Sequence, residues 1–231
     1  MTDIEATYVD HMGSDLSVVN SARVSFGKKS EALGHSAVGD GPMIPVMHER
    51  DIKLIKFLAR EKHTSPFGHA FASFHVKAPV FVARQLVKHK FLRWNEISRR
   101  YVDSEPELYE PAWRSRSADK KQGSGGPMEI SQDSEMLFHA TCRNALTTYD
   151  RMIKEGVSPE QARSILPQNM MTEWYWSGSL DAFADMCNLR CKPDTQYESQ
   201  LVANQISETM AGLFPVSWEA LMGQEGETDG G

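Results

Sequence analysis

Residues 69–89 read HAFASFHVKAPVFVARQLVKH and combine two hydrophobic periods. From His69 to Val76 the side chains alternate between two sets, which is typical of a strand. Pro79 then opens a helix that we expect to run to about His89, because proline is tolerated at the first helical position. The apolar face of this helix is Val80, Ala83 and Val87, and the opposite side carries Gln85, Lys88 and His89.

Further elements are expected on both sides of this strand–helix unit. Hydrophobic spacing predicts helices over 50–63, 131–155, 180–189 and 196–221, a short helix between Ser158 and Pro167, and strands over 99–102 and 171–176. The strands are few and are not regularly interleaved with the helices. This arrangement favours an α+β fold over a doubly wound sheet.

Length and composition are those of an ordinary globular protein. The chain has 231 residues, of which 40% are hydrophobic and 24% charged. We expect a single domain over 1–222, with surface-loop insertions at about 27–43 and 115–128 and a disordered tail over 223–231. No apolar run approaches the roughly 20 residues of a membrane span. The N-terminus has no signal pattern, so the sequence predicts a cytoplasmic protein with no membrane partner.

Several common site motifs are absent from the sequence. It has neither a GxGxxG after a strand nor a P-loop, and it lacks HExxH and GxSxG. Cys142, Cys187 and Cys191 lack CxxC spacing, which argues against a disulfide framework or a four-ligand zinc site. We expect them to be small apolar residues on helices. His63 and His69 are spaced too loosely to predict a metal site, and we expect none.

A local basic cluster points to a phosphate-bearing ligand. Residues 84–100 contain six Lys or Arg, one His and a single acid, whereas the whole chain has a formal net charge of −6. Guanidinium and ammonium groups are the side chains that neutralise phosphate oxygens. The acidic balance of the whole chain argues against a nucleic-acid polymer, which usually requires a broad basic face. A small anionic ligand in a confined pocket fits better.

Short motifs also follow one another in a distinctive order. They are HTSPFGH (63–69), FHVKAPVFVARQ (74–85), KHKFLRWNEISRRY (88–101), ARSILP (162–167) and NLR (188–190). Together they resemble the flavin-dependent thymidylate synthases, whose signature is R-H-R, seven residues and then S. The resemblance covers roughly residues 50–222.

The resemblance implies both an architecture and a reaction. The architecture is an antiparallel sheet flanked by long helices, assembled as a homotetramer with active sites between subunits. The reaction is the reductive methylation of dUMP to dTMP. Methylenetetrahydrofolate is the carbon donor, and NADPH reduces a bound FAD.

Roles for individual residues come from the same resemblance. Arg190 is the expected catalytic residue, which would contact uracil and stabilise the negative charge as N3 loses its proton. The expected dUMP-binding residues are Gln85, Lys88, Glu96, Ser98, Arg99, Arg100, Arg163 and Arg190. The expected FAD-binding residues are His63, Ser65, Lys88, His89, Lys90, Glu96, Ser179 and Asp185. Ser98 has no sequence-adjacent general base, so we interpret it as a binding residue and not a nucleophile.

Departures from the family pattern lie on the flavin side. Lys88 and Lys90 replace arginines, Gly68 stands where Glu is usual, and Asp181 and Asp185 stand where Arg and Asn are common. Lysine keeps the charge but loses the bidentate fork of arginine.

These departures leave alternatives open. The first is flavin-dependent hydroxymethylation of dUMP or dCMP on the same fold, in which water and not hydride completes the reaction. The second is a non-catalytic nucleotide-binding homologue. A thymidylate synthase of the cysteine-nucleophile type is disfavoured, because only Cys191 lies near a cluster of charge.

Overall fold

The computed structural model describes residues 3–36, 43–102, 104–117 and 123–223. Its main sheet is antiparallel, with the strand order β1-β4-β6-β5. These strands are β1 (Glu5–Met12), β4 (Phe71–Pro79), β5 (Arg93–Glu96) and β6 (Met171–Ser179). A separate antiparallel pair is formed by β2 (Gly34–Ser36) and β3 (Ile44–Val46).

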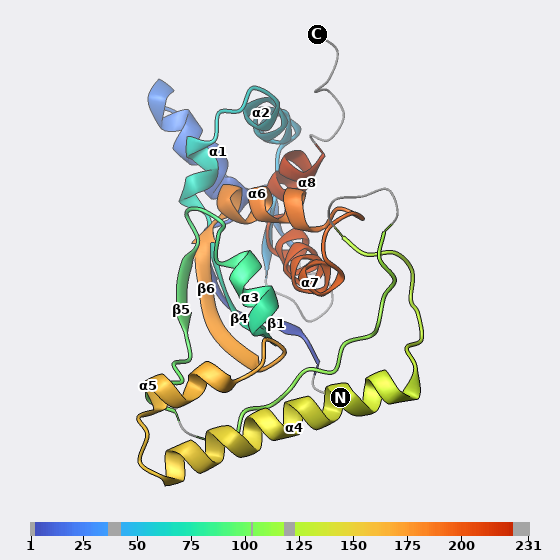
Figure 1. The fold of residues 1–231 in the computed structure, drawn as a ribbon. Coiled ribbons are helices and arrows are strands. Elements are labelled where there is room, and N and C mark those ends of the chain that lie inside the picture. Colours follow the sequence, from blue (N-terminus) through green and yellow to red (C-terminus); the bar gives the residue numbers. More distant parts are fainter. Residues whose placement is uncertain (1–2, 37–42, 103, 118–122, 224–231) are drawn as a thin grey trace.

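Helices surround the main sheet, as expected for an α+β fold. They are α1 (Asp15–Arg23), α2 (Glu49–Arg60), α3 (Val80–Leu86), α4 (Gln132–Lys154), α5 (Pro159–Ala162), α6 (Leu180–Arg190), α7 (Tyr197–Leu213) and α8 (Pro215–Met222). Short 3₁₀ helices are η1 (Val24–Phe26), η2 (Ser65–His69) and η3 (Arg163–Ile165). Figure 1 shows α1, α2, α6 and α8 gathered around one end of the sheet, with α4 crossing beyond the other end.

The central pair of strands carries the core of the molecule. Phe74 of β4 lies opposite Trp176 of β6, and Val76 lies opposite Trp174. All four side chains are buried, and the Phe74 ring meets Phe183 of α6 edge to face. The alternation that predicted this strand therefore reflects a sheet face covered by helices.

Each central strand passes directly into a helix. Pro79 ends β4 and Val80 begins α3, while Ser179 ends β6 and Leu180 begins α6. Since Pro79 pairs with Met171 and Phe71 pairs with Ser179, the two helices begin at opposite ends of the strand pair. The direct junctions fix the start of both helices to the register of the sheet.

Three sequence-based predictions need correction. Residues 99–102 contain no strand, and the strand in this region is β5, because its backbone pairs with β6. The helix after Pro79 ends at Leu86, and its buried residues are Val82, Ala83 and Leu86, with Val87 exposed. The predicted helix over 196–221 is two helices, α7 and α8, separated at Phe214.

The break between α7 and α8 has a clear physical cause. Pro215 stands at the first position of α8, where its missing N–H costs nothing. The buried carboxylate of Asp15 accepts hydrogen bonds from the backbone N–H groups of Val216 (3.0 Å) and Ser217 (2.9 Å). A side chain from α1 thus satisfies two N–H groups of the first turn of α8.

The segments expected to be loops or a tail are described only in part. Residues 27–43 contain β2, so this segment is not wholly a loop, and 37–42 lie outside the described residues. The described parts of 115–128 contain no helix or strand, and residues 118–122 are not described. The expected tail lies outside the described residues except for Gly223.

A buried acid connects α1 to α2. Asp51 of α2 is fully buried, and its Oδ1 accepts hydrogen bonds from the Arg23 guanidinium and from the Ser30 hydroxyl (3.0 Å). Arg50 reaches only to 4.0 Å from the same oxygen, and its side chain is 67% exposed. Arg23 is therefore the cation that compensates this buried charge.

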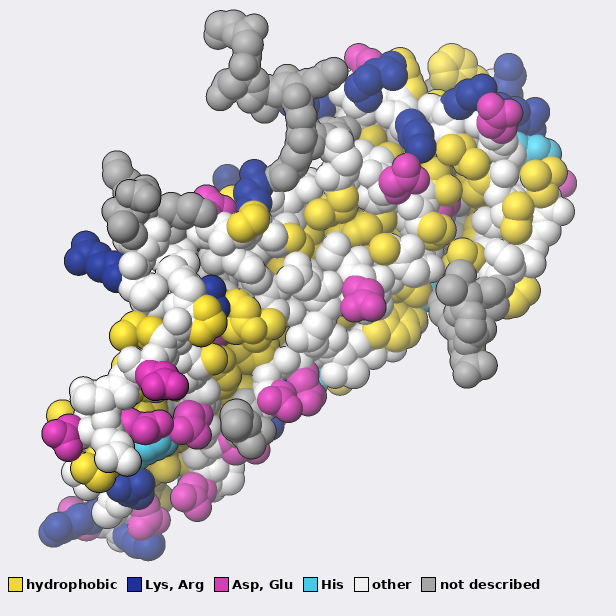
Figure 2. Space-filling model, turned by 90° about the vertical axis from the view of Figure 1, so that its right-hand side faces the viewer, with side chains coloured by type: hydrophobic (Ala, Val, Ile, Leu, Met, Phe, Trp, Pro, Cys, Tyr) yellow, Lys and Arg dark blue, Asp and Glu magenta, His cyan; other side chains and the backbone are white. Residues whose placement is uncertain are grey.

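The surface mixes charged groups with small apolar patches, as Figure 2 shows for one face. Met136 and Leu137 of α4 are among the exposed hydrophobic residues, at 62% and 68%. Within the described residues, none of the helices combines the length and the apolar character that crossing a membrane requires.

Candidate active site

A cavity of about 780 Å³, here called the Arg190 cavity, brings together two of the predicted site residues. Gln85 lies on α3, and Arg190 is the last residue of α6. Glu198 from the first turn of α7 lines the same cavity. The remaining lining residues are Pro111, Ala112, Trp113, Arg114, Gly123, Ser124, Leu189, Thr195 and Gln196. The cavity thus has cationic, amide and carboxylate groups within one hollow.

The guanidinium of Arg190 is held by a neutral histidine. Its Nε donates a hydrogen bond to Nε2 of His89 at 2.9 Å. Burial lowers the pKa of Arg190 from its usual value, but the guanidinium stays charged, because arginine does not lose its proton in proteins. In the described part of the chain its terminal nitrogens have no hydrogen-bond partner, so they are available to a ligand in the cavity.

Burial, and then the positive charge of Arg190, lower the pKa of His89 from 6.5 to about 4. The neutral ring keeps a lone pair on Nε2 to accept from Arg190. His89 was expected to bind FAD, and its ring contacts Arg190 and the edge of Trp176. His89 therefore supports Arg190, and its binding to FAD stays a prediction.

The shifted pKa of His89 makes a prediction about stability. In the folded protein this pKa is below that of the unfolded chain, so the contribution of His89 is fully present above about pH 6.5. It is lost as the pH falls from 6.5 towards 4, because the unfolded chain then binds the proton more tightly. We expect His89→Asn to remove this part of the acid sensitivity. Denaturant unfolding at several pH values checks it, and parallel stability curves for the two proteins would contradict it.

A second hydrogen bond fixes Gln85. The hydroxyl of Ser199, on α7, donates to Oε1 of Gln85. Ser199 is fully buried, and Gln85 is partly exposed to the cavity. Sequence reasoning did not select Ser199 or Glu198, because neither belongs to a motif that points to this cavity.

Most of the predicted dUMP-binding residues lie elsewhere. Ser98, Arg99 and Arg100 are in the turn after β5, and Arg163 is exposed at the start of η3. Arg100 and Arg163 both contact Glu160. Arg100 forms an ion pair with its carboxylate at 3.6 Å, and Nε of Arg163 donates a hydrogen bond to the backbone oxygen of Glu160. These residues therefore form their own group, which does not line the Arg190 cavity of the same chain.

Other predicted residues are placed by the sheet and by α3. The carboxylate of Glu96 accepts from the Thr172 hydroxyl at 2.7 Å and from the Trp94 ring nitrogen at 3.0 Å. Trp94 stacks on Trp174 with ring centroids 4.2 Å apart, so it is part of the packing. Lys88 and Lys90 are exposed beyond the end of α3, and Tyr101 is 79% exposed.

A second cavity, of about 740 Å³ and here called the His63 cavity, contains both of the residues predicted around η2. His63 and Ser65 line it together with the cations Arg23, Arg50 and Lys53. Its other lining residues are Ser21, Ala22, Ser25, Phe26, Leu54, Phe57, Leu58 and Pro66. Cations and hydroxyls suit phosphate oxygens, and the two phenylalanines suit a flat ring. The residues present therefore fit a flavin nucleotide.

The two remaining FAD candidates are in a different environment. Ser179 precedes α6, and Asp185 is exposed on that helix at a smaller cavity of about 290 Å³ that Asp181 also lines. Burial, and then the negative charge of Asp181, raise the pKa of Asp185. Two carboxylates repel phosphate, so this cavity does not fit the phosphate end of a flavin nucleotide.

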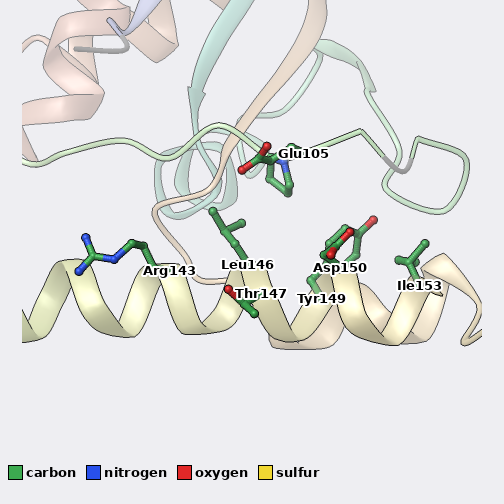
Figure 3. A pocket seen from close by; sticks show the side chains of 8 residues that line it. Glu105, Arg143, Leu146, Thr147, Tyr149, Asp150 and Ile153 are labelled. Atoms are coloured by element: carbon green, nitrogen blue, oxygen red, sulfur yellow. The ribbon is translucent and has the colours of Figure 1, made fainter. Parts of the chain in front are cut away.

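A further cavity lies away from every predicted site residue. Figure 3 shows it between α4 and the segment at Glu105, with Leu146 and Asp150 facing that segment. Its volume is about 440 Å³.

The cysteines and one group of possible metal ligands are further groups that could carry chemistry. Cys142 and Cys187 are buried on α4 and α6, as expected, whereas Cys191 is partly buried and follows the last residue of α6. Among the described residues, one group of potential ligands, Glu110, Glu135 and His139, has its ligand atoms within 4.8 Å of one another. Both acids are exposed, and the group contains none of the predicted site residues.

An antiparallel sheet with helices around it, and cavities lined by cations, amides and hydroxyls, define an α+β protein with sites suited to small phosphate-bearing ligands. Comparison with known families gives a specific result. A family model described as "Thymidylate synthase complementing protein" matches residues 7–216.

Individual relatives agree with this match. The chain is 36% identical over 213 residues to a flavin-dependent thymidylate synthase of Thermus thermophilus, covering 92% of this chain and 73% of the relative. It is 36% identical over 218 residues to one of Kosmotoga olearia, covering 93% and 88%. The chain belongs to the family of flavin-dependent thymidylate synthases, and it is therefore an enzyme.

Solved structures show the same relationship in three dimensions. A UMP/dUMP methylase, PolB from Streptomyces cacaoi bound with 5-Br dUMP, has 30% sequence identity and a TM-score of 0.79, covering 96% of each chain. The same methylase bound with 5-Br UMP has 28% identity and a TM-score of 0.76, covering 96% of this chain and 95% of the other.

Proposed function

We propose that this enzyme methylates dUMP to dTMP, with methylenetetrahydrofolate as the carbon donor and NADPH as the reductant of a bound FAD. The observation that carries the proposal is the Arg190 cavity, where a partly buried guanidinium and the amide of Gln85 both belong to the lining. The uracil edge presents two carbonyl oxygens, and N3 between them becomes an acceptor once it loses its proton, which suits a fork of N–H donors. Family membership supports the same substrate class.

In this proposal Arg190 acts on the base. Its fixed positive charge stabilises the negative charge that develops when N3 loses its proton, and this charge makes C5 nucleophilic. His89 holds the guanidinium through Nε, so the terminal nitrogens keep one orientation. Preorganised donors of this kind cost no rearrangement during the reaction.

The His63 cavity is the proposed FAD site. Ser65 and the nearby cations would hold the phosphates, and Phe26 and Phe57 offer faces for rings. Bound flavin supplies the reducing equivalents that turn the attached one-carbon unit into a methyl group. The exposed Lys88 and Lys90 remain candidates for the same cofactor.

We also propose a homotetramer with active sites shared between subunits. Within one chain, Ser98, Arg100 and Arg163 lie outside the cavity that contains Arg190 and Gln85. If these groups bind one dUMP molecule, those that hold its phosphate come from another copy of the chain. The separation of the two groups supports sharing.

Product analysis tests the proposed reaction. The purified protein should be yellow and should convert dUMP to dTMP only when FAD, NADPH and methylenetetrahydrofolate are all present. Mass spectrometry of the nucleotide separates the outcomes, because a hydroxymethyl product is heavier than a methyl product. A colourless protein that takes up no FAD and produces no new nucleotide would contradict the proposal.

UMP is a second candidate substrate, favoured by one observation. The structural neighbour PolB is described as a UMP/dUMP methylase and has been crystallised with both 5-bromo nucleotides. Parallel assays with UMP and dUMP decide whether this enzyme shares that range.

A further inference from the structure

We propose that Ser199 is a positioning residue that turns the amide of Gln85 so that the Arg190 cavity selects uracil over cytosine. This inference rests on the proposed function, since it concerns the base that the same site would bind. It concerns a residue that no signature motif includes, and it separates dUMP from dCMP, the two nucleotides that the sequence left open.

The hydrogen bond between Ser199 and Gln85 determines which end of the amide faces the cavity. Ser199 is fully buried, and its hydroxyl donates to Oε1 of Gln85 across 114 positions of sequence. In the described part of the chain, the Ser199 side chain makes no other hydrogen bond. A buried hydroxyl must direct its proton to an acceptor. If the amide were reversed, its NH2 group would face the hydroxyl, and the hydrogen bond from Ser199 to Gln85 would be lost.

The NH2 group of Gln85 is consequently left for the cavity. Among the described residues, Nε2 of Gln85 has no hydrogen-bond partner, and Gln85 lines the cavity together with Arg190. Gln85 lies in the last turn of α3, and His89, which contacts Arg190, follows the end of that helix, so both of these cavity donors lie at this end of α3. This wall of the cavity offers N–H donors, since arginine has no acceptor.

A wall of donors distinguishes the two pyrimidines at C4. Uracil carries an oxygen acceptor at this position, whereas cytosine carries an amino group that donates. A cytosine amino group would meet the NH2 of Gln85 donor to donor, and both groups would lose their hydrogen bonds to water without a replacement. An unsatisfied pair of this kind is costly in a partly buried site.

Glu198 also lines the cavity and offers the opposite preference. Its carboxylate accepts hydrogen bonds, and it comes from α7, whereas Gln85 comes from α3. We assign the C4 edge to Gln85 because it shares a wall with Arg190, the residue proposed to act on N3 next to C4. If Glu198 met C4 instead, the protein would prefer cytosine.

Equilibrium binding tests the inference without requiring turnover. Titration calorimetry with the full chain and FAD should show that dUMP binds about tenfold or more tightly than dCMP. Ser199→Ala should reduce this preference to within about threefold, because the amide can then rotate. Ser199→Thr keeps the hydroxyl and should retain the preference. Gln85→Glu presents a carboxylate and should reverse it.

A matched control is available on the same helix. Ser207→Ala removes the acceptor for the Trp218 ring nitrogen, a hydrogen bond of 3.1 Å. This variant should lower the melting temperature but leave the ratio of the dUMP and dCMP dissociation constants unchanged.

The outcomes separate this inference from the proposed function. An unchanged ratio in a folded Ser199→Ala protein, or equal binding of dUMP and dCMP by the wild-type protein, overturns the inference and leaves the proposed function in place. If neither nucleotide binds the wild-type protein, both are overturned.

Discussion

Replacing Arg190 by Ala is expected to lower turnover of dUMP by about 10²–10³-fold, the cost typical of removing a preorganised donor from a site of developing charge. The loss should be mainly in kcat, because the guanidinium is proposed to interact most strongly once N3 is deprotonated. Its location at the end of α6, with a partly exposed side chain, means that the fold should survive. Steady-state rates of dTMP formation measure the effect.

Two variants make the Arg190 result interpretable. Arg190→Lys keeps a positive charge but loses the fork and the Nε donor to His89, so it should recover only part of the activity. Arg151→Ala removes an exposed arginine that pairs with Glu155 on α4, and should leave turnover unchanged. Near-normal rates in Arg190→Ala would exclude the proposed catalytic role.

Replacing Arg23 by Ala is expected to lower the free energy of unfolding by about 3 kcal/mol, because breaking a buried ion pair leaves an uncompensated charge. The charge is that of Asp51, which is fully buried on α2. Only the Ser30 hydroxyl, at 3.0 Å, would then remain bonded to its Oδ1. Urea unfolding monitored by circular dichroism measures the change.

Arg50 provides the matched control for Arg23. It approaches the same carboxylate oxygen at 4.0 Å, but its side chain is 67% exposed and strongly hydrated. Arg50→Ala should change the free energy of unfolding by no more than about 0.5 kcal/mol. Equal losses in the two variants would show that Asp51 does not depend on Arg23 in particular.

Hydrophobic period predicted the parts of the fold in which burial is regular. The alternation before Pro79 predicted β4, and the long amphipathic stretch after Ser131 predicted α4, which ends two residues before Gly156 at φ +89°. The strand Arg93–Glu96 was missed because its residues are largely polar, and its backbone pairing with β6 decides its structure. Neither β1 nor α1 was predicted.

The candidate site was predicted where motifs exist and missed where only packing operates. Gln85 and Arg190 stand in recognisable motifs, and the structure places both in one cavity. Ser199 reaches Gln85 because α7 packs near α3, and no short sequence pattern encodes such a contact between segments so far apart. The proposed sharing of the site also depends on an assembly, which the pattern of one chain does not contain.

The direct junctions of β4 with α3 and of β6 with α6 have a consequence for engineering. The helices that carry Gln85 and Arg190 start from opposite ends of one strand pair. Their C-terminal ends are connected where Arg190, the last residue of α6, contacts His89, which follows α3. The backbone of this half of the cavity is therefore set by the register of the sheet. The cavity is also lined by Trp113 and Arg114, which lie outside any helix or strand. Library mutagenesis aimed at larger or altered nucleotides should therefore vary Trp113 and Arg114 and leave Gln85 and Arg190 unchanged.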